Sequence, residues 1–178
     1  DPRNPEMQKK LNLKIKYRES FRPFAPSVLD RKSEQYFNLK SKSPYMLLVK
    51  PVSEEIRNGK PQNYESLDLK DKLYFKRSSL PAITHIDYSA RVQTVHQESN
   101  PRYYQLIENF DKISNCGAVI NTSFNVRGEP IVCYPEEAIR CFMRTEMDLL
   151  VIGDYVFRKE DQPEFKSDDN WKEEFLLD

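Results

Sequence analysis

Residues 117–130 read GAVINTSFNVRGEP, a short apolar run that ends in small polar residues and an arginine. The apolar part, Ala118 to Asn121, follows a glycine and predicts a short strand. Strand ends followed by polar residues are where ligands bind in open α/β sheets. Hydroxyl and amide groups there can bind phosphate or carbonyl oxygens, and Arg127 can neutralise charge. The same residues are equally typical of a polar turn that hydrogen-bonds its own backbone, and the segment lacks P-loop spacing.

Helical and strand patterns alternate on both sides of this segment. Helices are predicted from Pro5 to about Lys16, between Val28 and Phe37, and from Pro101 and Pro135 onward. Asn before Pro is a favourable helix start. Strands are predicted at residues 45–49, 83–86, 90–95, 118–121, 149–152 and 155–157. Residues 50–80 are polar and irregular, which predicts a variable insertion or long loop. The alternation predicts an α/β or α+β fold with a mixed sheet.

Length, charge and cysteine usage narrow the class of protein. The 178 residues predict one domain, and the formal net charge of zero provides no global field toward nucleic acid or a membrane surface. We find no apolar run near the roughly 18 residues of a membrane span and no signal peptide. The three cysteines match no zinc pattern, which predicts reduced core thiols in a cytoplasmic protein. The start DPRNPEM lacks an initiator Met, so we expect a fragment of a longer protein.

Four cations lie in KIKYRESFRPF, residues 14–24: Lys14, Lys16, Arg18 and Arg22. Lysine supplies a point charge, and arginine a bidentate fork that suits phosphate or carboxylate. The segment therefore predicts either a phosphate clamp or an exposed, solvated helix end. From Glu160 onward the chain is rich in Asp and Glu, which predicts an acidic tail over residues 159–178.

Polar residues also follow one another in THIDYSARVQTV, residues 84–95. If this segment is a strand, Ser89, Arg91 and Gln93 share one face, together with His85 and Asp87. Such a face either meets water or lines a wet cavity, and His85 is either structural or a base or phosphate donor. His96 has no motif around it and receives no role.

No further catalytic pattern is present. Ser123 has no nucleophile elbow and no His–Asp pair tied to it. No cluster of side chains has convincing metal-ligand spacing, so no metal site is predicted.

Four segments in order resemble the C-terminal region of the NodU/CmcH family of O-carbamoyltransferases: KIKYRESFRPFAPSV, THIDYSARVQTV, NPRYYQLI and NTSFNVRGEPIVCYPEEAIRCF. The resemblance spans about residues 1–157 and is weakest over residues 50–80. It implies a YrdC-like open twisted mixed sheet with flanking helices over residues 1–158. It also implies that this domain binds carbamoyl phosphate and ATP and makes carbamoyladenylate. An ASKHA-like N-terminal domain, absent from this chain, would bind iron and transfer the carbamoyl group to an acceptor hydroxyl.

The resemblance also implies roles for particular residues. Contacts with carbamoyl phosphate or the transferred group are expected from Lys16, Arg22, Arg91 and Ser123. Further members of the nucleotide or phosphate site are Lys14, His85, Asn121, Asn125 and Arg127. A Mg²⁺ ion is expected to accompany ATP, and the N-terminal domain of the same polypeptide is the expected protein partner.

Two other functions compete with adenylate formation. A binding module for RNA or another polyanion could stack bases on Tyr17, Phe21 and Phe24 within the basic segment, although zero net charge disfavours it. A domain that only docks to the rest of its polypeptide would suit the acidic tail.

Overall fold

The structure, a computed structural model, describes residues 1–165. These fall into two compact units. Asp1–Gln8 and Phe21–Thr122 form the sheet unit, and Lys9–Ser20 with residues 123–165 form the helix–hairpin unit. The first helix, α1 (Met7–Leu11), runs from one unit into the other and continues as a π-helical turn, η1 (Asn12–Lys16).

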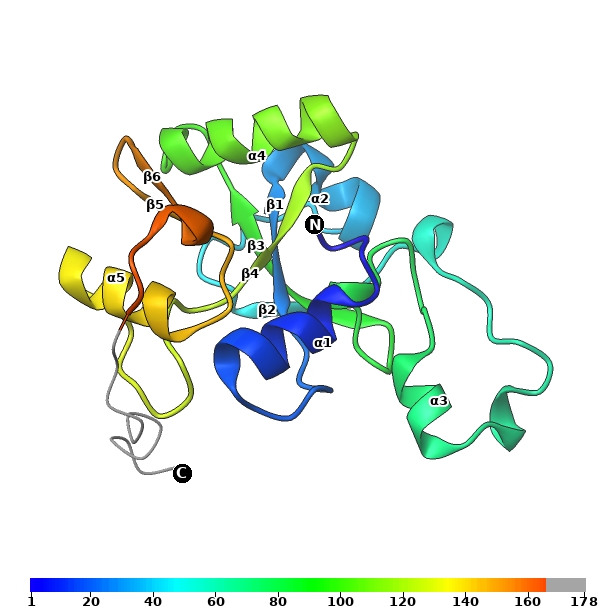
Figure 1. The fold of residues 1–178 in the computed structure, drawn as a ribbon. Helices are drawn as coiled ribbons and strands as arrows, with labels where there is room; N and C mark the ends of the chain where they lie inside the picture. Colours follow the sequence, from blue (N-terminus) through cyan, green and yellow to red (C-terminus); the bar gives the residue numbers. More distant parts are fainter. Residues whose placement is uncertain (166–178) are drawn as a thin grey trace. The chain divides into compact units, whose positions relative to one another are not determined.

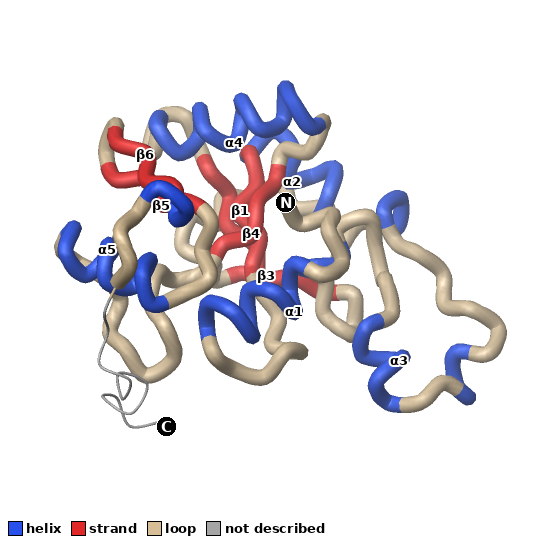
Figure 2. The backbone as a smooth tube through the Cα atoms, in the orientation of Figure 1, coloured by secondary structure: helices blue, strands red, loops and turns tan. Residues whose placement is uncertain are grey.

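A four-stranded mixed sheet forms the centre of the sheet unit (Figures 1 and 2). Its strands are β1 (Ala25–Leu29), β2 (Leu48–Pro51), β3 (Ser89–Val95) and β4 (Ala118–Asn121), in the order β2-β3-β1-β4. β1 is parallel to β3 and antiparallel to β4, and β2 is antiparallel to β3. This arrangement confirms the predicted mixed α/β sheet with flanking helices.

Two helices cover the sheet. α2 (Asp30–Phe37) follows β1 directly and buries Tyr36 and Phe37. α4 (Pro101–Ser114) connects β3 to β4, and its buried Ile107 packs against Leu29 and Val95. The N-terminus of α4 forms as predicted, because the Asn100 side chain accepts a hydrogen bond from the Tyr103 backbone N–H at 3.3 Å.

The helix–hairpin unit contains α5 (Pro135–Arg144) and the antiparallel pair β5 (Leu149–Ile152) and β6 (Tyr155–Arg158). Its core is formed by Ala138, Phe142 and Leu150. The turn between the strands uses Gly153 with φ +60°, a conformation that glycine adopts without strain. A short 3₁₀ turn, η5 (Lys159–Asp161), follows. Most of the predicted acidic tail, from residue 166 on, lies outside the described residues.

Several predicted element boundaries are wrong. The helix expected from Val28 begins at Asp30, because Val28 and Leu29 pair with β3. The buried strand expected at residues 45–49 is instead the edge strand Leu48–Pro51, in which Val49 is 59% exposed. Residues 83–86 form no strand. Pro81 starts a 3₁₀ turn, η4 (Pro81–Ile83), and its geometry interrupts any ladder there.

Residues 50–80 are mostly loop, as Figure 2 shows, and carry only short helices. These are η2 (Glu54–Ile56), η3 (Tyr64–Ser66) and α3 (Leu69–Tyr74). The buried side chain of Arg77 holds the end of α3 in place. Its guanidinium donates to the backbone oxygens of Leu73 and Phe75 at 3.1 Å each, to that of Ile86 at 3.3 Å, and to that of Lys72.

We therefore expect Arg77→Ala to lower the free energy of unfolding by about 3 kcal/mol, because it leaves several carbonyls without their charged donor. Urea unfolding of the two proteins measures this difference. Lys76→Ala is the matched control, since Lys76 is an exposed neighbouring cation, and its effect should stay within about 0.5 kcal/mol. An equally small effect of Arg77→Ala would show that the guanidinium does not stabilise the segment.

Candidate functional site

One face of the sheet carries polar side chains from β1, β3 and β4, and we call it the polar face. Ser27 lies opposite Gln93 in the parallel pairing of β1 and β3, and Ala25 lies opposite Asn121 in the antiparallel pairing of β1 and β4. Because side chains two residues apart share a face, Arg91, Gln93 and Asn121 all project from it. The prediction that Arg91 and Gln93 share a face is confirmed.

Arg91 and Asn121 flank a small residue on the polar face. The parallel register that pairs Ser27 with Gln93 places the residues two positions earlier, Ala25 and Arg91, level with each other. Ala25 is in turn opposite Asn121 in the antiparallel pairing. Neighbouring strands are about 4.8 Å apart, so the backbones of Arg91 and Asn121 are separated by roughly 10 Å. Between them the methyl group of Ala25 provides a low floor. This arrangement places a guanidinium and a carboxamide on either side of a residue with a small side chain.

Hydrogen bonds tie the polar face together around Gln93. The Ser27 hydroxyl donates to Gln93 Oε1 at 2.5 Å, and Asn121 Nδ2 donates to the same oxygen at 2.7 Å. Gln93 Nε2 donates to the backbone oxygen of Pro44 at 3.0 Å. Sequence reasoning placed Gln93 on this face but missed it as a member of the site. Its hydrogen-bond partners lie on β1, on β4 and in the loop at Pro44, so no local sequence pattern predicts them.

His85 lies outside β3 and lines a cavity of about 220 Å³. Phe21, Tyr74, Phe75 and Ile86 supply much of the apolar lining. Burial lowers the pKa of His85, and the charge of Arg91 acts in the same direction, whereas Asp87 opposes both. His85 is therefore neutral at pH 7. The expectation that His85 and Asp87 belong to the polar strand is wrong, because β3 begins only at Ser89.

Arg22 precedes β1 in an extended segment, as the neighbouring prolines predict. It is exposed, and its backbone oxygen accepts a hydrogen bond from Gln8 Nε2 at 3.3 Å. The same amide donates to the backbone oxygen of Phe21 at 2.9 Å. Gln8 thus anchors the chain on which Arg22 is presented.

In the helix–hairpin unit, Lys16 is buried and only 4% exposed. Its ammonium donates to the Ser123 hydroxyl at 3.1 Å and to the backbone and side-chain oxygens of Asn125 at 2.9 Å each, and it also contacts the Ser123 carbonyl. Burial is the main cause that lowers the pKa of Lys16 to about 8, and the charge of Arg18 lowers it further. For Lys16, the expectation of an exposed helix end is therefore wrong, because the side chain turns inward to the polar turn at residues 123–125.

Three other predicted site residues of this unit have partners within it. Lys14 forms an exposed ion pair with Glu146. Asn125 accepts from the Ser123 hydroxyl at 2.6 Å and donates through Nδ2 to the Glu129 backbone oxygen at 2.6 Å. The Arg127 guanidinium lies 3.7 Å from the Glu19 carboxylate. The turn that follows β4 thus hydrogen-bonds its own backbone, as one of the two alternatives for this segment predicted.

The nine predicted site residues divide between the two units. The sheet unit holds Arg22, His85, Arg91 and Asn121, and the helix–hairpin unit holds Lys14, Lys16, Ser123, Asn125 and Arg127. Within residues 1–165, no group of three or more His, Cys, Asp or Glu side chains could hold a metal ion. None of the helices in this part of the chain is long and apolar enough to cross a membrane.

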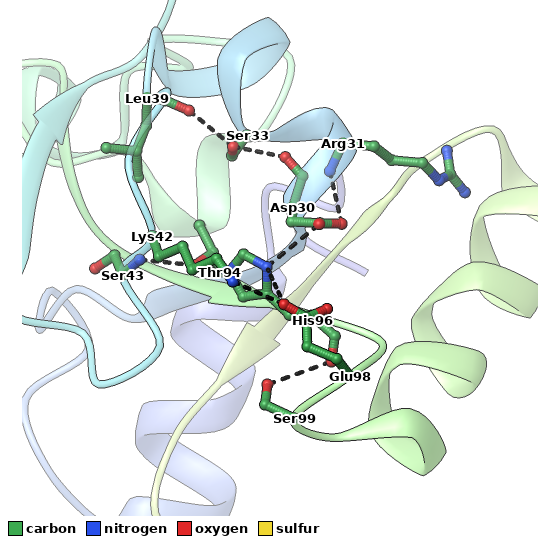
Figure 3. A network of polar contacts seen from close by, with 10 residues as sticks. All are labelled: Asp30, Arg31, Ser33, Leu39, Lys42, Ser43, Thr94, His96, Glu98 and Ser99. Atoms are coloured by element: carbon green, nitrogen blue, oxygen red, sulfur yellow. Dashed lines mark hydrogen bonds and ion pairs between the residues drawn. The ribbon is translucent and has the colours of Figure 1, made fainter.

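Figure 3 shows a network of polar contacts around the buried His96, a residue to which the sequence assigned no role. His96 Nδ1 lies 3.3 Å from the Asp30 carboxylate, and Nε2 lies 2.9 Å from the Thr94 hydroxyl. Thr94 Oγ1 also accepts the backbone N–H of Ser43 at 2.8 Å. The network joins the start of α2 to the end of β3 and to the loop that precedes Pro44.

The cysteines are free thiols. Cys116 and Cys141 are buried, as predicted, and burial raises the pKa of Cys141 to about 11. Cys133 is exposed, contrary to the prediction of a core thiol. It lies in the loop before α5, where its backbone N–H caps the helix by donating to Glu137 at 2.7 Å.

Comparison with known proteins identifies relatives over most of the chain. Residues 1–159 match the family described as Carbamoyltransferase C-terminus. The chain is 60% identical over its full length to an uncharacterised protein of Synechocystis, of which it covers 29%. It is 37% identical to nodulation protein NolO of Bradyrhizobium diazoefficiens, over 89% of the chain and 26% of the relative.

A third relative carries an enzyme name. The chain is 29% identical to the 3'-hydroxymethylcephem-O-carbamoyltransferase of Streptomyces clavuligerus, over 82% of the chain and 24% of the relative. The chain therefore spans about a quarter of the length of these curated relatives.

The low pKa of Lys16 has a measurable effect on stability. Below pH 8 the amine is protonated in both the folded and the unfolded chain, and the cost of burying the charge is present in full. As the pH rises from about 8 toward the ordinary lysine value of 10.5, the folded chain has lost this proton and the unfolded chain keeps it, so stability increases. We expect wild type to gain roughly 1–2 kcal/mol relative to Lys16→Met between pH 7 and pH 9.5.

Urea unfolding of both proteins at the two pH values measures this gain. Lys14→Met is the control, because Lys14 is exposed and lies in the same helical turn. A difference between wild type and Lys16→Met that stays constant with pH would mean that the buried amine titrates as an ordinary lysine.

Proposed function

Because the chain belongs to the Carbamoyltransferase C-terminus family, we propose that it is the part of an O-carbamoyltransferase that binds carbamoyl phosphate and ATP and forms carbamoyladenylate. The family match confirms the resemblance to the C-terminal region of the NodU/CmcH family. The acceptor hydroxyl would be selected elsewhere in the polypeptide. The name of the cephem relative specifies a hydroxymethyl group as the acceptor for that protein.

The observation that carries the proposal is the pair of side chains that flank Ala25 on the polar face. Arg91 is exposed, is always cationic and offers a planar fork to phosphate oxygens. Asn121, two strands away, offers a carboxamide to an uncharged polar group. Carbamoyl phosphate has this polarity, with a dianionic phosphate at one end and an amide at the other.

The chemistry requires positioning and charge neutralisation more than a nucleophile from the protein. Water first hydrolyses carbamoyl phosphate: its oxygen bonds to the phosphorus, the bond from that phosphorus to the carbamoyl oxygen breaks, and carbamate and inorganic phosphate form. A carbamate oxygen then bonds to the α-phosphorus of ATP. The bond from that phosphorus to the bridging oxygen breaks, and pyrophosphate leaves. Both reactants are anionic, so fixed cations lower their repulsion and stabilise charge in the transition state. Arg22 and Arg91 would supply this charge from the sheet unit.

Residues of the turn after β4 would have complementary roles. Ser123 is exposed, and we propose it as the substrate contact in this turn. Lys16 would act chiefly by holding Ser123 and Asn125 in their positions. The neutral imidazole of His85, beside the aromatic cavity, is a proposed partner for the nucleotide. The Mg²⁺ that accompanies ATP can be held largely by phosphate oxygens and water.

Binding of RNA is the weaker alternative. It requires exposed aromatic side chains within the basic segment. Phe24 is only 2% exposed, and the Tyr17 hydroxyl donates to the Arg144 backbone oxygen at 3.0 Å, which leaves Phe21 as the exposed ring of the three. A domain that only docks to the rest of its polypeptide would need no substrate affinity, and the binding experiment below distinguishes it.

We expect Arg91→Ala to weaken carbamoyl phosphate binding by about 10- to 100-fold, because it removes a charge-assisted contact to phosphate. Isothermal titration calorimetry with carbamoyl phosphate and with ATP measures this loss. Arg91→Lys should restore part of the affinity, since a point charge replaces the bidentate fork.

Arg102→Ala is the matched control, because Arg102 is an exposed arginine on α4 outside the polar face. Equal affinities in wild type, Arg91→Ala and Arg102→Ala would rule out the polar face as the anion site. The absence of any binding of either ligand to wild type would rule out the proposed function.

A further inference from the structure

The orientation of the Gln93 carboxamide is determined by a group that can only accept. Its nitrogen, Nε2, faces the backbone oxygen of Pro44 at 3.0 Å. A carbonyl has no proton to donate, so the NH₂ end of Gln93 must point toward Pro44. The oxygen, Oε1, consequently points across β1 to Ser27 and Asn121.

The orientation of Gln93 in turn determines that of Asn121. Gln93 Oε1 is an acceptor, so the group that faces it at 2.7 Å must be the NH₂ of Asn121. Asn121 Oδ1 therefore points away from Gln93. This oxygen is accessible and has no hydrogen-bond partner within the part of the chain that the structure describes. The polar face thus presents an acceptor, and not a donor, at this point.

Hydrogen bonds to β3 fix the loop that carries the Pro44 carbonyl. The preceding residue, Ser43, donates its N–H to Thr94 Oγ1 and its hydroxyl to the Val92 backbone oxygen, both at 2.8 Å. Its carbonyl accepts the Thr94 N–H at 2.9 Å. Figure 3 shows how His96 supports the same Thr94 hydroxyl from the other side. A slip of this loop would remove the partner that orients Gln93.

We propose that Gln93 is a positioning residue that turns the Asn121 oxygen toward the substrate and thereby makes the site select a carbamoyl group through its NH₂. This inference rests on the proposed binding of carbamoyl phosphate. With the phosphate on Arg91, the carbamoyl NH₂ donates to Asn121 Oδ1. Acetyl phosphate has the same charge and a similar shape, but a methyl group replaces the NH₂ and leaves this acceptor unpaired.

The measured quantity is the ratio of the dissociation constants for acetyl phosphate and carbamoyl phosphate, obtained by calorimetry. One hydrogen bond predicts a ratio of roughly tenfold in wild type. In Gln93→Leu the Asn121 carboxamide is free to turn either end outward, so the ratio should fall to within about twofold. Asn121→Ala should give the same fall, because the acceptor is removed altogether.

Gln93→Glu separates positioning from a merely structural role. One of its carboxylate oxygens still accepts from Asn121 Nδ2, although the other faces the Pro44 carbonyl with no proton to donate. The ratio should therefore stay near tenfold, while the added negative charge and the lost bond to Pro44 weaken both ligands. Gln97→Leu is the matched control, because Gln97 is exposed in the turn after β3, and it should behave as wild type. Inorganic phosphate, which has no NH₂, reports in every variant whether the anion site is folded.

The possible failures are distinguishable. If wild type binds carbamoyl phosphate but does not discriminate against acetyl phosphate, the selectivity is wrong and the proposed function stands. An unchanged ratio in both Gln93→Leu and Asn121→Ala would likewise overturn the role of this pair alone. If wild type binds none of the three phosphates, the proposed function fails and this inference fails with it.

Discussion

The register between β1 and its two neighbours determines which side chains meet on the polar face. Ser27 opposite Gln93 and Ala25 opposite Asn121 bring one arginine and one carboxamide of β3 together with a carboxamide of β4, on either side of β1. A slip of one residue in either pairing would turn every side chain of that strand to the other face. The register is specified by burial, since Val28, Ala90 and Val92 on the opposite face are fully buried. Leu29 and Val95, which lie beyond Ser27 and Gln93 on the polar face, are also buried, against Ile107 of α4. Burial on both faces therefore determines which polar side chains meet.

Local sequence signals predicted the elements that begin or end at a definite residue. β4, α4, α5 and the β5–β6 hairpin were predicted because Gly117, Pro101, Pro135 and Gly153 mark their ends. The segment before β3 was predicted incorrectly. The β-branched residues on either side of His85 favour a strand, but Pro81 initiates a 3₁₀ turn there. The exposure of β2 depends on its place at the sheet edge, which no local pattern contains.

Buried cations explain why the candidate site was only partly predictable. Lysine and arginine are seldom buried unless paired, so the sequence placed Lys16 at the surface or on a ligand. The structure gives it oxygen partners more than a hundred residues away. Arg77 likewise supports the irregular segment through backbone carbonyls, which are present in every sequence and so give no signal. Arg91, by contrast, was correctly assigned to the polar strand face because the period of a strand is local information.

The two asparagines of NTSFN show that a ligand site and a self-bonded turn can share one segment. Asn125 uses its oxygen on Lys16 and Ser123 and donates through its nitrogen to Glu129, so the acceptor end of its carboxamide is occupied within the protein. Asn121 spends its nitrogen on Gln93 and Met46 and keeps an accessible oxygen. Residue type alone cannot separate these roles. What separates them is the partner on β3, two strands away, because the Gln93 oxygen occupies the donor end of Asn121 and leaves its acceptor end available to a substrate.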